Sequence, residues 1–172
     1  MSYALFINRN DIIKNTPLQG AIDSDALLPF LRTAQDKYLK NLLGTVLFDY
    51  LQAQITAGTV STLSVYYQDL LDDHIKNVLI WYACVEYIPF SSIQFKSNGS
   101  VKQQSEQGTA PSKVEIDYLL NKALNNADYY ALRLQNYLIS YSNNIPQYLQ
   151  SVGNQTQIYP DQSNQYFGGI QL

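Results

Sequence analysis

The sequence predicts a mainly α-helical fold: a small helical bundle with a long C-terminal helix, one β-hairpin or extended loop, and an extended C-terminal arm. Two observations carry this prediction. Apolar residues recur at intervals of three and four over long stretches, which is the spacing of one helix face. Glycine and proline stand between these stretches, where helices end. The 172 residues suffice for one domain with a core of its own.

The N-terminal elements are expected to be short. The apolar run at residues 5–7 is a candidate strand, and Asn10 and Asp11 offer caps for a brief helix that ends near Lys14. Residues 16–20 include a proline and a glycine, which break that helix.

A second helix is expected to begin at Ser24 or Asp25 and to stop at Gly44. Pro29 falls in about its first turn, where a missing N–H costs little. Its inward face is expected to consist of Leu27, Leu31, Ala34, Tyr38 and Leu42.

Two further helices follow. Thr45 is expected to cap the first, which ends at Gly58, and Ser64 opens a long helix that runs to about Ile88 before Pro89 ends it. The long helix has two apolar stripes, which indicates that it packs on more than one side. The inward residues of the shorter helix are expected to be Leu47, Phe48, Leu51 and Ile55.

A hairpin and the longest helix complete the domain. Residues 93–96 and 101–104 alternate around Ser97-Asn98-Gly99-Ser100, and alternation around Asn-Gly is a strong hairpin signal. Pro111 and Ser112 begin a helix that runs to about residue 141 and would span about 45 Å. Its inward residues are expected to be Val114, Tyr118, Ala123 or Leu124, Ala127, Ala131, Leu134 and Leu138.

The composition changes at residue 143. The last thirty residues carry one charge, Asp161, and are rich in asparagine and glutamine, so they cannot form a core of their own. They also carry apolar residues at short intervals, which favours an arm that becomes ordered on a neighbour over a floppy terminus. We therefore expect a helical domain at 1–142 and an arm at 143–172, whose deletion leaves a folded core.

The sequence predicts no enzyme, no cofactor and no metal site. It contains one histidine and one cysteine, and it has none of the phosphate-binding, zinc or redox motifs. Asp69, Asp73 and His74 are the best candidates for catalytic residues. An enzyme that uses them ranks third, behind two hypotheses in which the protein acts by binding other proteins. The simpler interpretation is a solvated helix face with an Asp72–Lys76 ion pair and a partly buried histidine.

Two residues of the apolar stretch at 78–90 need an explanation. Cys84 is expected to be an inert core thiol, because apolar surroundings raise its pKa. Glu86 must find a partner, and a basic residue of another helix or of another subunit fits equally well.

Charge and hydropathy exclude several classes. A net charge of −3 argues against binding by phosphate neutralisation. Lys96 and Lys102 flank the hairpin tip and could touch a phosphate backbone, although edge lysines commonly just prevent aggregation. The longest apolar stretch has thirteen residues, too few for a membrane span. No signal peptide is expected.

Tyrosine is the strongest compositional signal, with fifteen of the 22 aromatic residues. Tyrosine is enriched at protein interfaces because it buries a large ring and keeps a polar tip. We expect several members of this set to face partners: Tyr66, Tyr67, Tyr87, Tyr129, Tyr130, Tyr137 and Tyr141.

The run DALLPFLRTAQ at residues 25–35, followed by LLGTVLF at residues 42–48, resembles the first helices of head–tail connector (adaptor) proteins of tailed bacteriophages. The resemblance is to the ring protein next to the portal in phages of Bacteroidetes, crAss-like phages included. The hairpin or loop, the long last helix and the aromatic tail, which ends with residues 167–170, fit the same pattern, so the resemblance covers most of the chain.

The resemblance implies a structural virion protein at the portal–tail junction, assembled in the bacterial host cytoplasm. Such proteins form a homo-oligomeric ring, usually of twelve copies, that contacts the portal protein and further tail or ring proteins. The ring extends the channel, through which DNA passes without sequence-specific binding, and no membrane is involved. The alternative is a small cytosolic helical adaptor or regulator that binds a protein partner.

In this family the loop and the C-terminal arm reach the portal, a neighbouring subunit or the next ring, which implies interface residues in two segments of this chain. Those of the loop are Ile93, Phe95, Lys96, Val101 and Lys102, and those of the arm are Tyr148, Leu149, Ile158, Tyr159, Tyr166, Phe167 and Ile170.

Overall fold

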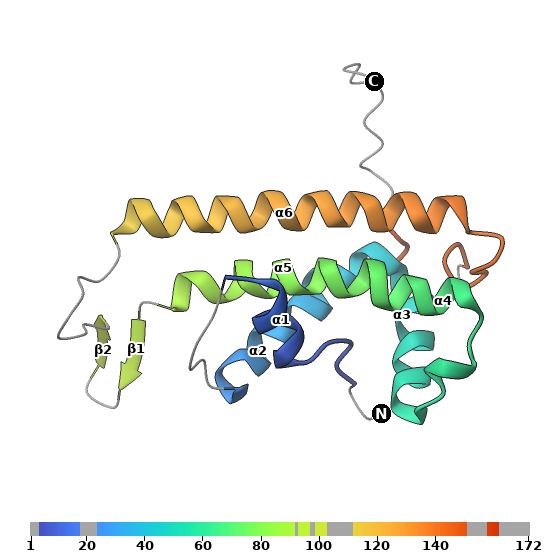
Figure 1. Ribbon diagram of the computed structural model, residues 1–172, viewed down its shortest axis with the longest axis horizontal. Helices are drawn as coiled ribbons and strands as arrows, with labels where there is room; N and C mark the ends of the chain where they lie inside the picture. The colour runs from blue at the N-terminus through green and yellow to red at the C-terminus, as the bar shows by residue number, and fades with distance from the viewer. Residues whose placement is uncertain are drawn as a thin grey trace, which may run out of the picture.

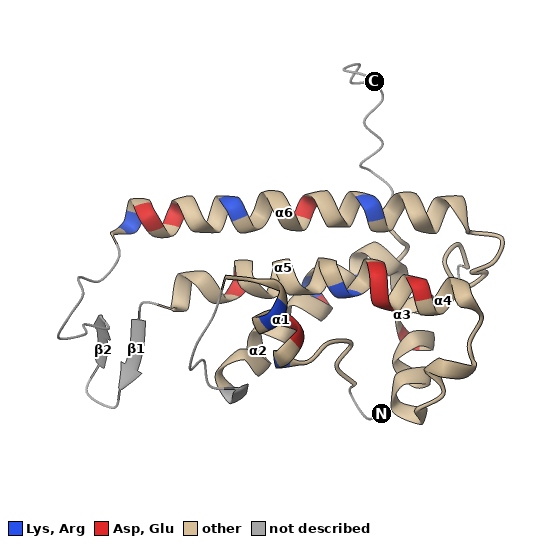
Figure 2. Cartoon of the chain, in the orientation of Figure 1, with Lys and Arg blue, Asp and Glu red and all other residues tan. Residues whose placement is uncertain are grey.

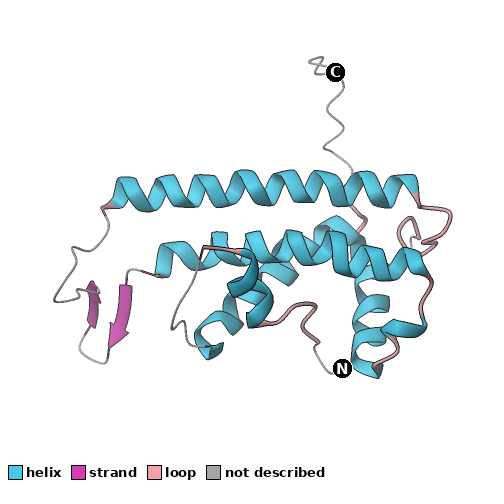
Figure 3. Cartoon of the chain, in the orientation of Figure 1, coloured by secondary structure: helices cyan, strands magenta, loops and turns pink. Residues whose placement is uncertain are grey.

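The structure is a computed structural model that describes residues 4–17, 24–91, 93–96, 99–102, 112–150 and 158–161. It is mainly helical, with a long C-terminal helix, which confirms the predicted fold class (Figures 1 and 3). The longest helix, α6 (Lys113–Ser140), lies along one side of the molecule, and α5 (Lys76–Tyr87) runs beneath it (Figure 1). Helices α1 (Arg9–Asn15) and α2 (Ser24–Ala34) lie on the other side of α5, whereas α4 (Val65–Asp69) continues the line of α5 (Figure 1).

The N-terminal segment departs from the prediction. Residues 5–7 form no strand; instead the Phe6 N–H donates a hydrogen bond to Oε1 of Gln35, 2.9 Å away. Helix α1 spans Arg9–Asn15, and its N-cap is Asn8, before the residues expected to cap it. Asn8 and Asp11 form a capping box, each side chain accepting a hydrogen bond from the other's backbone N–H. The predicted short helix is therefore confirmed, with an earlier start.

The second predicted helix is built from three segments: α2 at Ser24–Ala34, the π-helix η1 at Gln35–Leu39 and the start of α3 at Lys40–Ala57. Pro29 lies in the second turn of α2 and not in the first. Gly44 breaks α3 with φ 74° and ψ 160°, so the predicted stop is confirmed at that residue. After the break α3 continues to Gly58, which ends it in the left-handed conformation, as expected.

The predicted helix from Ser64 to Ile88 is confirmed as one continuous rod. It consists of α4 at Val65–Asp69, the π-helix η3 at Leu70–Ile75 and α5 at Lys76–Tyr87. The 3-10 turn η4 at Ile88–Phe90 ends it at the expected proline, and another 3-10 turn, η2 at Val60–Thr62, precedes it.

The predicted hairpin is also confirmed. Strands β1 (Ile93–Lys96) and β2 (Gly99–Lys102) pair antiparallel, with Ile93 opposite Lys102 and Lys96 opposite Gly99. The second strand begins two residues earlier than the sequence suggested, because Gly99 pairs within the ladder. The hairpin lies at the end of the molecule where α6 begins (Figure 1).

Helix α6 spans Lys113–Ser140 and is capped by Ser112, whose backbone N–H donates to Glu115 Oε2 at 2.8 Å. The boundaries are as predicted, but part of the predicted inward face is wrong. Val114 and Tyr118 are 77% and 69% exposed, and Leu124 also points outward. The buried residues are Ala123, Ala127, Ala131, Leu134, Gln135 and Leu138.

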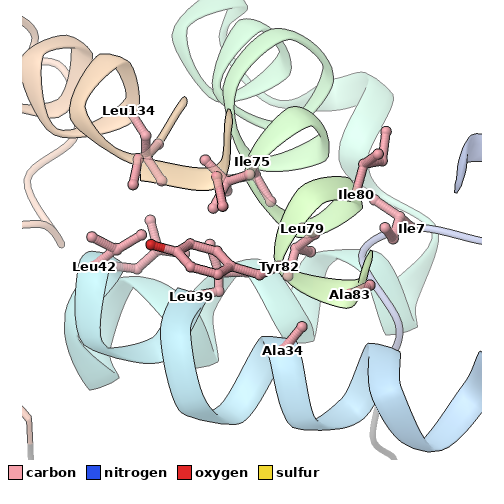
Figure 4. Packing of buried hydrophobic residues seen from close by; sticks show 14 of the residues in the cluster. Ile7, Ala34, Leu39, Leu42, Ile75, Leu79, Ile80, Tyr82, Ala83 and Leu134 are labelled. Carbon is pink, nitrogen blue, oxygen red and sulfur yellow. The ribbon is translucent and has the colours of Figure 1, made fainter. Parts of the chain in front are cut away.

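The core lies between α6, α5 and the α2–η1–α3 segment. In Figure 4 the Tyr82 ring of α5 reaches toward Leu39 and Leu42 on one side and lies below Leu134 of α6. Tyr82 also stacks on Tyr38 with ring centroids 4.0 Å apart. The apolar stripes predicted for these helices therefore meet in one shared core.

Residues after α6 take part in this core. Ile145 and Tyr148 are buried, at 0% and 1% exposure, and Pro160 is buried against Gly44. Residues 143–150 and 158–161 therefore belong to the helical domain, whereas the sequence assigned them to a separate arm. A deletion of residues 143–172 would remove core side chains and is not expected to leave the core intact.

Candidate assembly surface

The outward side of α6 is the most prominent exposed apolar surface among the described residues. A helix advances by about 100° per residue, so positions spaced by three or four share a face. Eight exposed residues lie within one sector of about 80° opposite the buried face, and none is charged. We call this set the outer stripe: Val114, Tyr118, Asn121, Asn125, Tyr129, Leu132, Asn136 and Ile139.

The sequence concealed this surface because the first third of α6 offers two apolar faces. Val114 and Tyr118 were assigned to the core, yet Ile116 and Leu120 are the partly buried residues there. The spacing from Leu120 to Ala123 and Ala127 would have identified the inward side. Exposed apolar side chains that line a whole helix face are typical of protein contact surfaces.

The C-terminal segment at residues 158–161, which we call the strap, is bound to the break in α3. Thr45 N–H donates to the Ile158 carbonyl, and Ile158 N–H donates to Thr45 Oγ1, both at 2.9 Å. Thr45 was expected to cap a helix, but this hydroxyl binds the strap instead. At the other end, Asp161 N–H donates to the Asn41 carbonyl at 2.8 Å.

Gly44 forms the part of α3 against which the strap packs. A helix break leaves backbone N–H and carbonyl groups without partners inside the helix. The strap provides hydrogen-bond partners for these groups. Pro160 lies so close to Gly44 that a Cβ atom there would be 2.7 Å from Pro160 Cδ. Gln135 of α6 also binds the strap, because its Nε2 donates to the Asp161 carbonyl at 2.8 Å.

The structure separates the residues predicted for the arm interface. Tyr148 is a core residue, so its assignment to an interface was wrong. Leu149, Ile158 and Tyr159 are 46%, 39% and 54% exposed and remain accessible. The other three, Tyr166, Phe167 and Ile170, lie outside the described residues.

The five hairpin residues predicted to contact partners have a described backbone only. They lie in the two strands, and their side chains are outside the described part of the structure: Ile93, Phe95, Lys96, Val101 and Lys102.

The tyrosines predicted to face partners are mostly part of the fold. Tyr67 is buried, and Tyr66, Tyr87, Tyr130 and Tyr137 pack against the core. Tyr129, in the outer stripe, and Tyr141, just after α6, are exposed, at 57% and 39%. The tyrosine surplus therefore serves the core more than the sequence suggested.

Glu86 has its partners within the chain. Its Oε1 accepts hydrogen bonds from Lys37 Nζ at 2.8 Å and from Tyr38 OH at 2.7 Å. Burial opposes ionisation of Glu86, but these two hydrogen bonds outweigh it and hold the pKa of the carboxyl below its usual value. Of the two alternatives left open by the sequence, the residue of another helix is confirmed.

The residues considered for catalysis lie on the surface of η3 and α4. Burial, aided by the nearby Arg133 charge, lowers the pKa of His74 against the opposing effect of Asp73 and Asp69, so the ring is neutral at pH 7. Its ring packs on Tyr137 with centroids 4.2 Å apart.

Lys76 does not pair with Asp72 as expected. It forms an ion pair with Asp11 of α1, with 3.0 Å between Nζ and Oδ1. Cys84 is a buried free thiol, as predicted, and burial raises its pKa to about 12.

Within the described ranges, no group of three or more histidine, cysteine or acidic residues is arranged to bind a metal ion. None of the described helices combines the length and the apolar character that a membrane span requires.

Comparison with known proteins adds a family. No curated protein and no solved structure matches the chain. Residues 39–158 match a family of unknown function, DUF6712. The match begins at the end of η1, covers every later helix and the hairpin, and ends at the first residue of the strap. Because it spans more than half of the chain, the protein belongs to the DUF6712 family.

Proposed function

We propose that this protein is a structural subunit of a virion: an adaptor ring, of twelve copies in the usual arrangement, between the portal and the tail of a tailed bacteriophage. The ring extends the DNA channel and gives tail components a docking surface. The subunit is not an enzyme; it works by contacts with its own copies, with the portal protein and with further tail or ring proteins.

The observation that carries the proposal is the outer stripe of α6. A domain whose longest helix keeps one face packed and leaves the opposite face uncharged and partly apolar is suited to association with other protein surfaces. Val114 and Tyr118, near the start of α6, are the most exposed of its apolar and aromatic members. The resemblance of residues 25–48 to phage connector proteins gives this association its context.

Two other segments supply contacts in the proposed ring. The hairpin stands at one end of the domain, next to the start of α6 (Figure 1), where it can reach a neighbouring layer. Residues 162–172 continue from the strap, which is fixed to α3 and α6 by Asn41 and Gln135. That segment contains the predicted interface residues Tyr166, Phe167 and Ile170.

The test is to purify the phage particles that encode the protein and to determine their portal–tail junction by single-particle electron microscopy. A closed ring of this chain next to the portal is the expected result. Absence of the chain from purified particles would overturn the proposal and favour the cytosolic adaptor or regulator, which should then be recovered with one soluble partner.

A truncation sharpens this test. A chain that ends at Asp161 keeps the strap and all described core residues, so it should unfold at the wild-type temperature. In the connector role it should reduce tail attachment, because the segment with Phe167 and Ile170 is lost. The matched control is Val65→Ala, which removes an exposed apolar side chain outside the arm, the hairpin and the outer stripe and should leave tail attachment unchanged.

A further inference from the structure

Four of the six charged residues of α6 lie on the two sides of the outer stripe. The other two are in the first turn: Lys113 lies outside both sides, and Glu115, which points in the same direction as Arg133, is engaged in the capping box with Ser112. Figure 2 colours the charged residues along α6. Asp117 and Asp128 lie along one side, which we call the acidic edge, and Lys122 and Arg133 lie along the other, the basic edge. At about 100° per residue, the two edges are about 140° apart around the helix axis, with the stripe between them.

These charges are free to act outside the chain. Asp117 and Lys122 are exposed and form no ion pair within the described residues. Asp128 is exposed, and its Oδ1 accepts a hydrogen bond from Tyr82 OH at 3.1 Å, so that Oδ2 can accept from another donor. The Arg133 guanidinium lies 6.0 Å from the Tyr129 ring centroid and is also exposed.

The pattern repeats along the helix. Asp117-Tyr118 and Lys122 recur eleven positions later as Asp128-Tyr129 and Arg133. Eleven residues are about three turns of an α-helix, so the repeated residues lie nearly above one another. In both repeats the base follows the acid by five residues. The offset along the helix between an acid and its base is therefore the same in the two repeats.

We infer that α6 is the contact between copies of this chain, in which two α6 helices lie parallel, with the acidic edge of one against the basic edge of the next. The occupant of this surface is a second copy, because the surface carries both halves of its own charge complement. The outer stripe supplies the apolar and asparagine contacts beside these charges.

The direction of the helices follows from the charges. In a parallel pair, opposite edges meet, so Asp117 approaches Lys122 of the second copy and Asp128 approaches its Arg133. In an antiparallel pair the same edges meet, which places acid against acid and base against base. The observed sorting therefore favours the parallel arrangement.

The distances allow both ion pairs at once. Five residues correspond to a rise of about 7.5 Å, and side chains on a helix lean toward its N-terminus. The long side chains of Lys122 and Arg133 therefore lean back toward the level of the acids that precede them. Because the offset is the same in both repeats, one alignment of the helices satisfies both pairs.

This inference specifies how copies of the chain would contact one another in the proposed ring. It depends on the proposed function only for the statement that the assembly closes into a ring. A contact between two different edges leaves one edge free on each outer copy, so further copies can add until the assembly closes. Association between copies can be measured on the purified chain, whereas the virion role is measured on particles, so the failure of one is distinguishable from the failure of the other.

The test reverses one edge at a time in the full chain. The variant Asp117→Lys, Asp128→Lys has two basic edges, and the variant Lys122→Glu, Arg133→Glu has two acidic edges. Each alone should self-associate about tenfold or more weakly than wild type in sedimentation velocity. An equimolar mixture of the two should recover association, and so should one chain that carries all four substitutions.

The control for the Asp117→Lys, Asp128→Lys variant is Asp49→Lys, Asp72→Lys, which makes the same change in net charge at exposed positions of other helices. It should associate like wild type. Because Asp128 also holds Tyr82, a second series limited to Asp117 and Lys122 tests the contact without that bond, with circular dichroism to verify folding. A monomeric wild-type chain, or mixed variants that associate no better than either alone, would overturn the inference.

Discussion

Replacing Gly44 by alanine tests the account of the helix break and the strap. Gly44 has φ 74° and ψ 160°, a region that is essentially restricted to glycine, and an alanine there costs about 1–3 kcal/mol in backbone strain alone. The added Cβ would also lie 2.7 Å from Pro160 Cδ, so the strap must move. Weakening even two strap hydrogen bonds adds about 1–3 kcal/mol.

We therefore expect Gly44→Ala to lower the free energy of unfolding by about 3 kcal/mol or more, which for this chain length lowers the melting temperature by about 6–12 °C. Gly58→Ala is the matched control. Gly58 also has a positive φ, 69°, but nothing lies within 4 Å of its added Cβ. It should cost only about 1 kcal/mol.

Urea denaturation of the two variants gives the comparison. If Gly44→Ala costs no more than Gly58→Ala, the Pro160 contact contributes nothing and the reasoning is refuted. A double-mutant cycle adds a second criterion: Pro160→Ala should cost less in the Gly44→Ala background than in wild type, because the clash has already displaced the strap.

Three further outcomes are expected. In chemical denaturation, Tyr148→Ala should lower the free energy of unfolding by about 3–5 kcal/mol, whereas Leu149→Ala should change it by no more than about 0.5 kcal/mol. Equal effects of the two substitutions would instead support an arm that is separate from the core. Because the pKa of Glu86 is depressed in the folded state, its contribution is present above the unfolded value of 4.5 and disappears as pH falls through the folded pKa, so Glu86→Gln should flatten the acid limb of a stability–pH profile. Cys84 should react with a thiol reagent only on unfolding, since its raised pKa and burial suppress the thiolate; rapid labelling of the native chain would contradict its burial.

The helices and their ends could be predicted from the sequence because their signals are local. Gly44, Gly58 and Ser112 mark boundaries through conformations or hydrogen bonds that involve only a few neighbouring residues. The hairpin was predicted for the same reason, since alternation around Asn98-Gly99 is a short-range pattern.

The errors arose where tertiary contacts decide. Periodicity alone could not tell which apolar face of α6 meets α5, so Val114 and Tyr118 were placed inside. The strap was missed because its partners are remote in the sequence and a low-charge segment carries no periodic signal. Lys76 forms its ion pair with Asp11 and not with Asp72, which is nearer in the sequence, because helix α1 packs beside α5.

The candidate surface was only partly foreseen. The sequence indicated a protein that acts through contacts, but it placed those contacts in the hairpin and the arm. The outer stripe could be recognised only once the buried face of α6 was known, because exposure is defined by what the rest of the chain leaves uncovered.

The strap also has a consequence for the order of folding. The hydrogen bond between Ile158 and Thr45 joins positions 113 residues apart, and closing a loop of that length costs about 4 kcal/mol of chain entropy. The helices between them form through much shorter contacts and can assemble first. The break at Gly44 therefore stays open to water until late in folding, and amide exchange at Thr45 should report that last step.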